Sequence, residues 1–397
     1  MTWWQKLKSN PLAWFGGLVL LVFYLVAIGA ELVAPYDPYE SQVNGALLPP
    51  TQVYWRTQQG QWIGPHVYPT TQGPIDMQTG QRELVVDRQS PAPLRLFVQG
   101  SPYSILKLTL PIPKFQQVTL TPPPPAPGKP PSLPKQEWQL KFDEKELFKG
   151  FRGTFHLFGT AGAAKFNLLG TDDAARDQFS RLAYGSRISL SIGLVGIVIS
   201  YPLGMLVGGI SGFFGGVLDA VLMRLVEVIM TIPGIYLLVA LAAVLPPGLS
   251  SAERFLLIVL ITSFIAWAGL ARVVRGQVLS IKERDFVQAA RAMGGNPLYI
   301  ILRHILPQTA TYIIISATLT VPSFIVAESV LSLIGLGISQ PDPSWGNMLS
   351  SATNASILVL QPWLVYAPAL LIILTVLSFN LLGDGLRDAL DPRDLRR

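Results

Sequence analysis

Six long apolar runs constrain the fold of this chain more than any other feature of its sequence. Each run has roughly the 20 residues that an α-helix needs to cross the hydrocarbon layer of a bilayer. With 50% hydrophobic and only 14% charged residues, the chain is also too apolar for an ordinary soluble globular protein. The runs predict an all-α, polytopic membrane protein with six spanning helices, at Leu12–Ala34, Ile188–Ile210, Leu225–Leu245, Phe255–Ala271, Thr309–Leu336 and Trp363–Leu382.

The first run follows Lys6 and Lys8, a basic start that secretory signal peptides also have. Its apolar length exceeds the roughly 7 to 15 residues of a signal-peptide core, so we interpret it as an uncleaved membrane anchor. The sequence contains no cysteine, which excludes disulfides, zinc thiolate sites and thiol nucleophiles.

The basic residues beside the runs predict which side of the membrane each end faces. Cytoplasmic flanks of membrane helices are enriched in Lys and Arg. If the N-terminus is cytoplasmic, the inner flanks hold thirteen Lys and Arg residues and the outer flanks hold four, so we predict that both termini are cytoplasmic. The net charge of +6 then reflects topology and indicates no nucleic-acid partner. The inner flanks hold Lys6, Lys8, Arg224, Arg272, Arg275, Lys282, Arg284, Arg291, Arg303, Arg387, Arg393, Arg396 and Arg397, and the outer flanks hold Arg176, Arg181, Arg187 and Arg254.

Residues 36–169, between the first two runs, contain 19 of the 33 prolines and form a different kind of chain. Short strands are predicted between Gly and Pro turns, and the proline-rich stretch at 122–134 predicts an extended, semi-rigid connector. The insertion is either a lineage-specific addition without a role of its own or a site where a partner docks. The predicted strands of the insertion are 82–86, 94–98 and 104–110.

The whole chain is predicted to divide into three parts: 1–35 (cytoplasmic segment and first helix), 36–169 (external, partly β insertion) and 170–397 (transmembrane core).

Small residues and prolines inside the runs predict how the helices pack and bend. Glycine recurs every four residues along the second run, which predicts a face where another helix packs closely. A proline inside a spanning helix removes a backbone hydrogen bond and permits a kink. Both residue types are also common in membrane helices that have no such role. The glycines are Gly204, Gly208, Gly212 and Gly216, and the prolines are Pro202, Pro233, Pro322 and Pro368.

Few charged residues lie in or beside the runs, and each should face protein, water or an interface because a charge at mid-membrane is costly. Arg224 and Glu227 are three residues apart and could pair on one helix face. Glu328 is the only acid of the fifth run, where it could line a passage, but we favour a structural role such as capping a neighbouring helix. The remaining acids are Glu31 and Asp219.

A charged, amphipathic segment at 286–307, FVQAARAMGGNPLYIILRHILP, separates the fourth and fifth runs. Helix-forming residues precede a Gly-Gly pair at 294–295 that should end the helix, and Asn-Pro at 296–297 restarts the chain. Ala289 and Ala290 would let another protein approach the helix backbone closely. The chain has no GxxxxGK[ST] loop for ATP, and we predict no catalytic, cofactor or metal site.

The segment Gln288–Pro307 resembles the EAA loop of ABC importer permeases, whose pattern is Glu-Ala-Ala, three residues, Gly, nine residues, Ile, one residue, Leu-Pro. Two positions differ, because Gln288 replaces the acid and His304 replaces the isoleucine. The sequence Arg-His-Ile-Leu-Pro at this point is similar to the corresponding sequence in the family branch that imports oligopeptides, dipeptides and nickel. The matching residues are Ala289, Ala290, Gly294, Leu306 and Pro307.

Other stretches resemble the second permease subunit of peptide importers, and together they cover the first run and everything from Leu169 onward. In the insertion, only FVQGSPY at 97–103 is similar to family members with an enlarged first external loop. The stretches are LGTDDAARDQFSRLAYGSRISLSIG at Leu169–Gly193, LSLIGLG at Leu331–Gly337, PSWGNML at Pro343–Leu349 and FNLLGDGLRDALDPR at Phe379–Arg393.

This resemblance implies a type I ABC importer transmembrane domain in the bacterial cytoplasmic membrane. The implied partners are a second permease subunit, two cytoplasmic ATPase subunits and an external solute-binding protein. The loop 284–307 would then be a coupling helix seated in the ATPase, so that ATP-driven closure tilts the spans and alternates access. The implied ATPase-contacting residues are Gln288, Ala289, Ala290, Met293 and Gly294; Leu306 and Pro307 would set the angle of the fifth span, and Glu328 and Pro322 are candidates for the path or for a structural role.

Peptide is the substrate that the resemblance favours, with nickel or another small solute as the alternative. A secondary transporter or channel would need intramembrane charges or an inverted repeat, and neither is evident. A membrane-anchored receptor would use the insertion as its working part. For the loop alone, the competing interpretation is an amphipathic helix that lies on anionic lipid.

Overall fold

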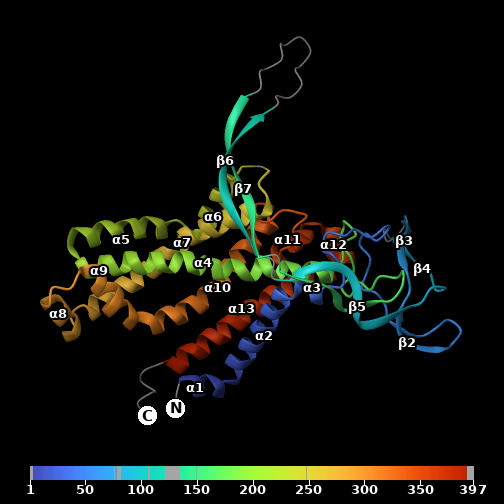
Figure 1. Ribbon diagram of the computed structural model, residues 1–397, viewed down its shortest axis with the longest axis horizontal. Helices are drawn as coiled ribbons and strands as arrows, with labels where there is room; N and C mark the ends of the chain where they lie inside the picture. The colour runs from blue at the N-terminus through green and yellow to red at the C-terminus, as the bar shows by residue number, and fades with distance from the viewer. Residues whose placement is uncertain are drawn as a thin grey trace, which may run out of the picture. The chain divides into compact units, whose positions relative to one another are not determined.

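The computed structural model describes residues 3–75, 77, 82–105, 108–120, 135–148, 150–246 and 248–390 (Figure 1). By their contacts the chain divides into two compact units, residues 1–101 with 155–397, and residues 102–154. The larger unit contains the membrane helices and both ends of the insertion. The smaller unit is the middle of the insertion. The division of the chain at residues 35 and 169 stays a prediction.

Among the described residues, five helices are long and apolar enough to cross a membrane, or six if one bent pair counts as a span. The fourth of them joins α9, a π turn, a 3-10 turn and α10 into one stretch, Pro297–Leu333. The others are α2 (Pro11–Ile28), α4 (Gln178–Phe214), α7 (Ser251–Ile281) and α13 (Trp363–Leu390), and the bent pair is α5 (Gly216–Thr231) with α6 (Gly234–Ala243).

The third predicted span, Leu225–Leu245, is not one continuous helix. α5 ends at Thr231 and α6 begins at Gly234, and the two helices are bent by 80°. Pro233 lies at the break, where it has no N–H for the helical ladder and disfavours helical geometry in the residue before it. The apolar run predicted the length of this span but not its division into two helices.

The remaining short helices connect or cap the long ones. α2 begins at a strong cap, because the Asn10 side chain accepts hydrogen bonds from the N–H groups of Leu12 and Ala13 and Pro11 occupies the first turn. The short elements are α1 (Trp3–Ser9), α3 (Ala30–Val33), α8 (Asp285–Ala292), α9 (Pro297–Ile300), the π turn η1 (Ile301–Ile305), the 3-10 turns η2 (Leu306–Thr309) and η3 (Ser350–Thr353), α11 (Trp345–Leu349) and α12 (Ala355–Leu360), whereas α10 (Ala310–Leu333) is the long part of the fourth span.

The predicted glycine face holds α4 directly against the backbone of α7 (Figure 1). A Cβ atom on Gly204 would lie 2.9 Å from the Trp267 carbonyl oxygen, and one on Gly212 would lie 2.8 Å from the Arg275 carbonyl oxygen. Close packing along this stripe is therefore confirmed. Gly216 is an exception, because it begins α5 at φ +58° with no other atoms close to it.

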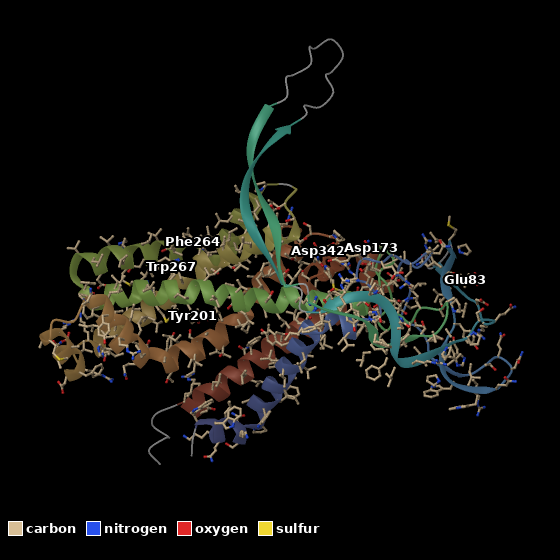
Figure 2. The ribbon with its side chains drawn as sticks, viewed as in Figure 1. Glu83, Asp173, Tyr201, Phe264, Trp267 and Asp342 are labelled. Atoms are coloured by element: carbon tan, nitrogen blue, oxygen red, sulfur yellow. The ribbon has the colours of Figure 1, made fainter. Side chains whose placement is uncertain are left out.

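Hydroxyl groups join α4 to a second neighbour, α10. The Tyr201 hydroxyl of α4 lies 2.9 Å from the Ser316 Oγ and 2.9 Å from the Thr320 Oγ1, both on α10 (Figure 2). On the α7 side, Ser263 donates a 3.2 Å hydrogen bond to the Gly196 carbonyl. α4 is thus the central helix of the larger unit, with α7 and α10 on either side.

A four-stranded sheet in the order β1–β2–β5–β8 and a separate antiparallel pair, β3–β4, belong mostly to the larger unit, while β5 beyond Ser101 and β8 before Phe155 are counted in the smaller one. Tyr54 of β1 pairs with His66 of β2, which pairs with Pro93 of β5. β4 coincides with the strand predicted at 82–86, and the segment predicted at 94–98 lies within β5. The bounds are β1 (Tyr54–Arg56), β2 (Trp62–Val67), β3 (Thr70–Ile75), β4 (Arg82–Val86), β5 (Ala92–Ile105) and β8 (Phe151–Thr160).

The smaller unit contains the long antiparallel pair β6 (Leu108–Leu120) and β7 (Lys135–Phe148). Its register runs from Leu108 opposite Phe148 to Leu120 opposite Lys135. The strand predicted at 104–110 includes 106–107, which lie outside the described residues, as does the proline connector predicted at 122–134.

Buried ion pairs fasten the two ends of the insertion to the start of α4. Asp172 pairs with Arg176 at 2.7 Å and with Arg181 at 3.3 Å. Arg181 also donates to the carbonyls of Pro38, at 3.2 Å, and Pro341, at 3.0 Å. One guanidinium therefore joins the beginning of the insertion, the residues just after its end and the segment before α11.

Asp177 caps α4 just outside the spanning segment and is the basis of a pH prediction. One carboxylate oxygen accepts the Ser180 N–H at 2.7 Å, and burial raises the pKa of Asp177 from 3.8 to about 7. Because the folded chain binds more protons than the unfolded chain in this window, the stability from this group is full below pH 4 and is lost as pH rises through about 7. We expect the thermal-unfolding midpoint of purified protein to fall from pH 4.5 to 7.5.

The Asp177→Asn variant is expected to flatten this pH dependence, because asparagine keeps the cap but cannot ionise. The comparison of midpoints at matched pH in one detergent checks the prediction. Equal slopes for the variant and the original protein would show that Asp177 does not carry the effect.

Candidate coupling surface and transmembrane groove

The coupling segment folds as the short helix α8, Asp285–Ala292, between α7 and α9. Asp285 in its first turn suits the positive end of the helix dipole. At its other end Gly294 has φ +77°, and the Gly295 N–H bonds the Ala290 carbonyl at 3.0 Å. The predicted helix end at 294–295 is thus confirmed, since a left-handed residue after a helix is usually glycine.

One face of α8 is fixed to the membrane helices. Val287 is 0% exposed and Ala290 is 6% exposed. Both belong to an apolar cluster with residues of α4, α7, α9 and η1, among them Phe213, Val278 and Ile301. The Arg291 guanidinium lies over the Phe213 ring, 4.3 Å from its centre, and so adds a cation–π contact to the end of α4.

The opposite face of α8 is exposed. Gln288 and Ala289 are exposed, and Met293, directly after the helix, is 82% exposed. Gln288 donates to the Lys282 carbonyl at 3.1 Å, which ties this face to the end of α7. The sequence-based prediction placed Ala290 against an approaching partner. In the structure Ala290 lies on the buried face of α8 and packs against this chain's own core.

The segment after α8 runs without a break into the fifth span. The Asn296 side chain accepts the Leu298 N–H at 2.9 Å and starts α9. Leu306 is buried in the same cluster as Ala290, whereas Pro307 is exposed in the 3-10 turn that enters α10. A displacement of α8 would therefore reach α10 through packed, helical backbone.

An ion pair that the sequence did not predict lies close to this end of the helices. Asp219 of α5 accepts hydrogen bonds from Arg275 of α7, at 2.9 Å from Nε and 2.5 Å from Nη2, and from the Ser211 hydroxyl of α4. It joins three helices where the glycine stripe ends. The predicted Arg224–Glu227 pair is confirmed at 2.9 Å and lies on the exposed surface of α5.

A mostly apolar groove of about 460 Å³ opens between α6, α7 and α10. Thr262, Thr320 and Ser323 are among its lining residues. Each of their hydroxyls donates to a carbonyl of its own helix, so these groups can serve the groove only as acceptors. The apolar part of the lining includes Ile235, Leu238, Ile265, Phe324, Val326 and Val330.

Glu328 and Pro322, the two residues singled out in the fifth run, are buried and do not line this groove. Glu328 accepts hydrogen bonds from Ser332 at 2.7 Å and from Ser344 at 2.8 Å. Ser344 is the cap of α11, where its hydroxyl accepts the Asn347 N–H at 3.0 Å. Glu328 therefore holds α11 against α10.

Two family models match the chain. Residues 201–395 match the binding-protein-dependent transport system inner membrane component, and residues 2–50 match the N-terminal TM domain of oligopeptide transport permease C. The dipeptide transport system permease protein DppC of Bacillus subtilis is 42% identical over 228 residues, which are 57% of this chain and 69% of that protein. The chain belongs to the OppC/DppC-like permeases. It is thus a multi-pass transport subunit of the inner membrane.

Further relatives of this permease have similar identities. The oligopeptide transport system permease protein OppC of Haemophilus influenzae is 42% identical over 229 residues, covering 58% of this chain and 71% of that protein. A chain of the inward-facing MetNI methionine ABC transporter aligns with a TM-score of 0.38 and 21% identity, covering 51% of this chain and 92% of that chain. Neither family model includes residues 51–200, so most of the insertion lies outside both.

Proposed function

We propose that this permease is one subunit of an ATP-driven importer of short peptides. The observation that carries the proposal is α8, a helix fixed by Val287 and Ala290 to the spanning helices while its other face is exposed. A helix held in this way can transmit force and is unlike one that lies loosely on lipid. The peptide assignment is supported by the relatives, which are named for dipeptide and oligopeptide transport.

The proposed partners are two ATPase subunits, a second permease subunit and an external solute-binding protein. Gln288 and Ala289, on the exposed face of α8, and Met293, directly after that helix, would contact the ATPase. Ala290 and Leu306 would pass the movement into the core that they share. In this arrangement both termini are cytoplasmic and the insertion is external, in agreement with the distribution of Lys and Arg.

The groove between α6, α7 and α10 is the proposed contribution of this subunit to the passage. The second permease subunit would supply the facing wall. The hydroxyls of Thr262, Thr320 and Ser323 donate to carbonyls of their own helices and would accept hydrogen bonds from the N–H groups of a passing peptide, while the apolar wall binds no particular side chain strongly. The break at Pro233 lets α6 move separately from α5 and so change the width of the groove.

The test is uptake of radiolabelled trialanine by proteoliposomes that contain the complete importer, with the solute-binding protein outside and ATP inside. We expect accumulation that requires hydrolysable ATP. Equal uptake without the ATPase subunits would overturn the ATP-driven mechanism. Uptake of a nickel chelate but not of any peptide tested would overturn the peptide assignment.

A further inference from the structure

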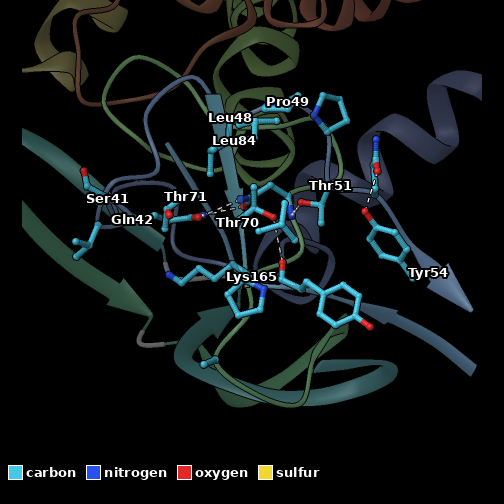
Figure 3. A pocket seen from close by; sticks show the side chains of 18 of the residues that line it. Ser41, Gln42, Leu48, Pro49, Thr51, Tyr54, Thr70, Thr71, Leu84 and Lys165 are labelled. Atoms are coloured by element: carbon cyan, nitrogen blue, oxygen red, sulfur yellow. Dashed lines mark hydrogen bonds between the residues drawn. The ribbon is translucent and has the colours of Figure 1, made fainter. Parts of the chain in front are cut away.

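A partly open pocket lies in the insertion, separate from the groove between the membrane helices. It has a volume of about 410 Å³, within the range of about 300–1,000 Å³ that is usual for small-ligand pockets. Its walls come from the segment 40–54, from β3 and β4, and from the stretch after β8, all in the larger unit. Figure 3 looks into this pocket, with Lys165, Thr70 and Tyr54 among the labelled residues.

A charge of each sign stands at the wall of the pocket. The Lys165 ammonium pairs with the Glu40 carboxylate at 2.6 Å, and the two side chains are 31% and 50% exposed. An exposed pair of this kind contributes only about 0–1 kcal/mol, so its partners can separate at little cost. Each could then meet an opposite charge on a ligand, and the long Lys165 stem gives it reach.

One edge of strand β3 faces the same space. Pro69 accepts the Asp87 N–H from the β4 side, whereas Gln72 donates its N–H at 2.9 Å to Asn44, on the other side of the strand. Backbone groups of alternate residues point the same way, so Thr70 also directs its N–H and C=O away from β4. Thr70 lines the pocket together with Gln42 and Val43 of the facing segment.

The rest of the lining suits apolar side chains of ordinary size. Pro49, Leu84 and Val86 provide aliphatic surface, and Tyr54 packs edge-on against Tyr68 with ring centres 5.2 Å apart. Gln42 and Asn167 bond one another reciprocally at 2.7 and 3.0 Å, which fixes that wall of the pocket.

We propose that this pocket binds a short peptide with free termini, in extended form along the edge of β3. The Lys165 and Glu40 side chains, 2.6 Å apart without ligand, would swing away from one another, so that the ammonium pairs with the peptide carboxylate at one end and the Glu40 carboxylate with the peptide amino group at the other, while Thr70 exchanges main-chain hydrogen bonds. The two or three residues of such a peptide span roughly 7–11 Å. The insertion would thus hold substrate outside the membrane core. This inference rests on the proposed peptide substrate.

The experiment measures binding of tritiated Ala-Leu-Ala to the full-length chain in nanodiscs, without the solute-binding protein. We expect the N-acetylated and C-amidated forms to bind at least tenfold more weakly than the free peptide. Lys165→Gln should weaken binding of the free peptide tenfold or more but leave binding of the amidated form unchanged. Thr71→Trp, which fills the pocket, should remove binding of the free peptide.

The matched control is Arg88→Gln. Arg88 is an exposed residue of the insertion that does not line the pocket, so this variant removes a positive charge from outside the site. It should bind the free peptide as the original chain does. Equal binding of free and blocked peptides, or unchanged binding by both Lys165→Gln and Thr71→Trp, would overturn the pocket assignment. Peptide uptake by the complete importer would still stand in that case, whereas absence of all peptide uptake would instead refute the proposed function.

Discussion

Replacing Met293 with aspartate is expected to reduce ATP-driven uptake at least tenfold while leaving the permease in the membrane. Met293 is 82% exposed at the end of α8, so the substitution removes little packing within this chain. If the ATPase covers this position, the variant loses the about 1.5–3 kcal/mol that burial of a methionine side chain contributes, and it also buries an unpaired charge. A loss of that size is roughly ten- to hundredfold in association. The measurements are uptake and co-purification of the ATPase subunits.

The chain offers a matched control in Met77, which is 93% exposed in the insertion. Met77→Asp makes the same chemical change far from α8 in sequence, and it should leave ATPase co-purification unchanged. Full uptake and full co-purification in the Met293→Asp variant would remove α8 from the ATPase interface. Ala290→Asp is unsuited to this test, because a charge at a 6% exposed position would disrupt the cluster beneath α8 whatever the partner does.

The coupling helix could be predicted from sequence, but the face that it exposes could not. Gly294 and Asn296 mark the end of one helix and the start of the next through local backbone preferences, which are visible in the sequence. Ala289 and Ala290 are adjacent and equally small, so nothing in the residue types separates them. Their difference arises because only one of them points at Val278 and Ile301, which are distant in the sequence.

The membrane helices show the same limit. Apolar length predicted the spans, yet α4 begins at Gln178, ten residues before the predicted Ile188. The first part of α4, residues 178–187, is too polar to have been predicted as part of a spanning helix. It is helical because Asp177 caps it and because Arg181 is held by the ends of the insertion. Similarly, Pro233 predicted a kink, whereas the structure has two helices at 80°.

The insertion was the hardest part to predict, because its strand order is not local. β2 pairs with β5 across the intervening pair β3–β4, and β8 completes the sheet from beyond the smaller unit. Alternation of residue types identifies a strand but not its distant partner. The pocket at Lys165 and Glu40 is equally non-local, since 125 residues separate the two side chains, and sequence spacing gave no sign of it.

Gly208→Leu is expected to remove the folded permease from the membrane almost completely. A Cβ atom at this position would overlap the Ala271 carbonyl and lie 2.9 Å from the Val274 Cβ and 3.0 Å from the Arg275 nitrogen. Two of these three atoms belong to the α7 backbone, which cannot move aside as a flexible side chain can. The cost should exceed the about 1–3 kcal/mol of ordinary overpacking, because the whole α4–α7 contact must open. Quantitative immunoblotting of membrane fractions and the thermal midpoint of any purified remainder measure the effect.

Gly276→Leu in α7 is the matched control, because a Cβ atom there would meet no atom within 4 Å. Leucine favours a helix over glycine by about 1 kcal/mol, so this variant should be as abundant as the original chain, or slightly more stable. If both leucine variants were lost alike, the defect would come from added bulk in a membrane helix and not from the contact of α4 with α7. If both were tolerated, the glycine stripe would not hold the two helices together. Loss of the Gly208 variant alone is the outcome that the geometry requires, since a Cβ atom meets the α7 backbone at Gly208 and no atom within 4 Å at Gly276.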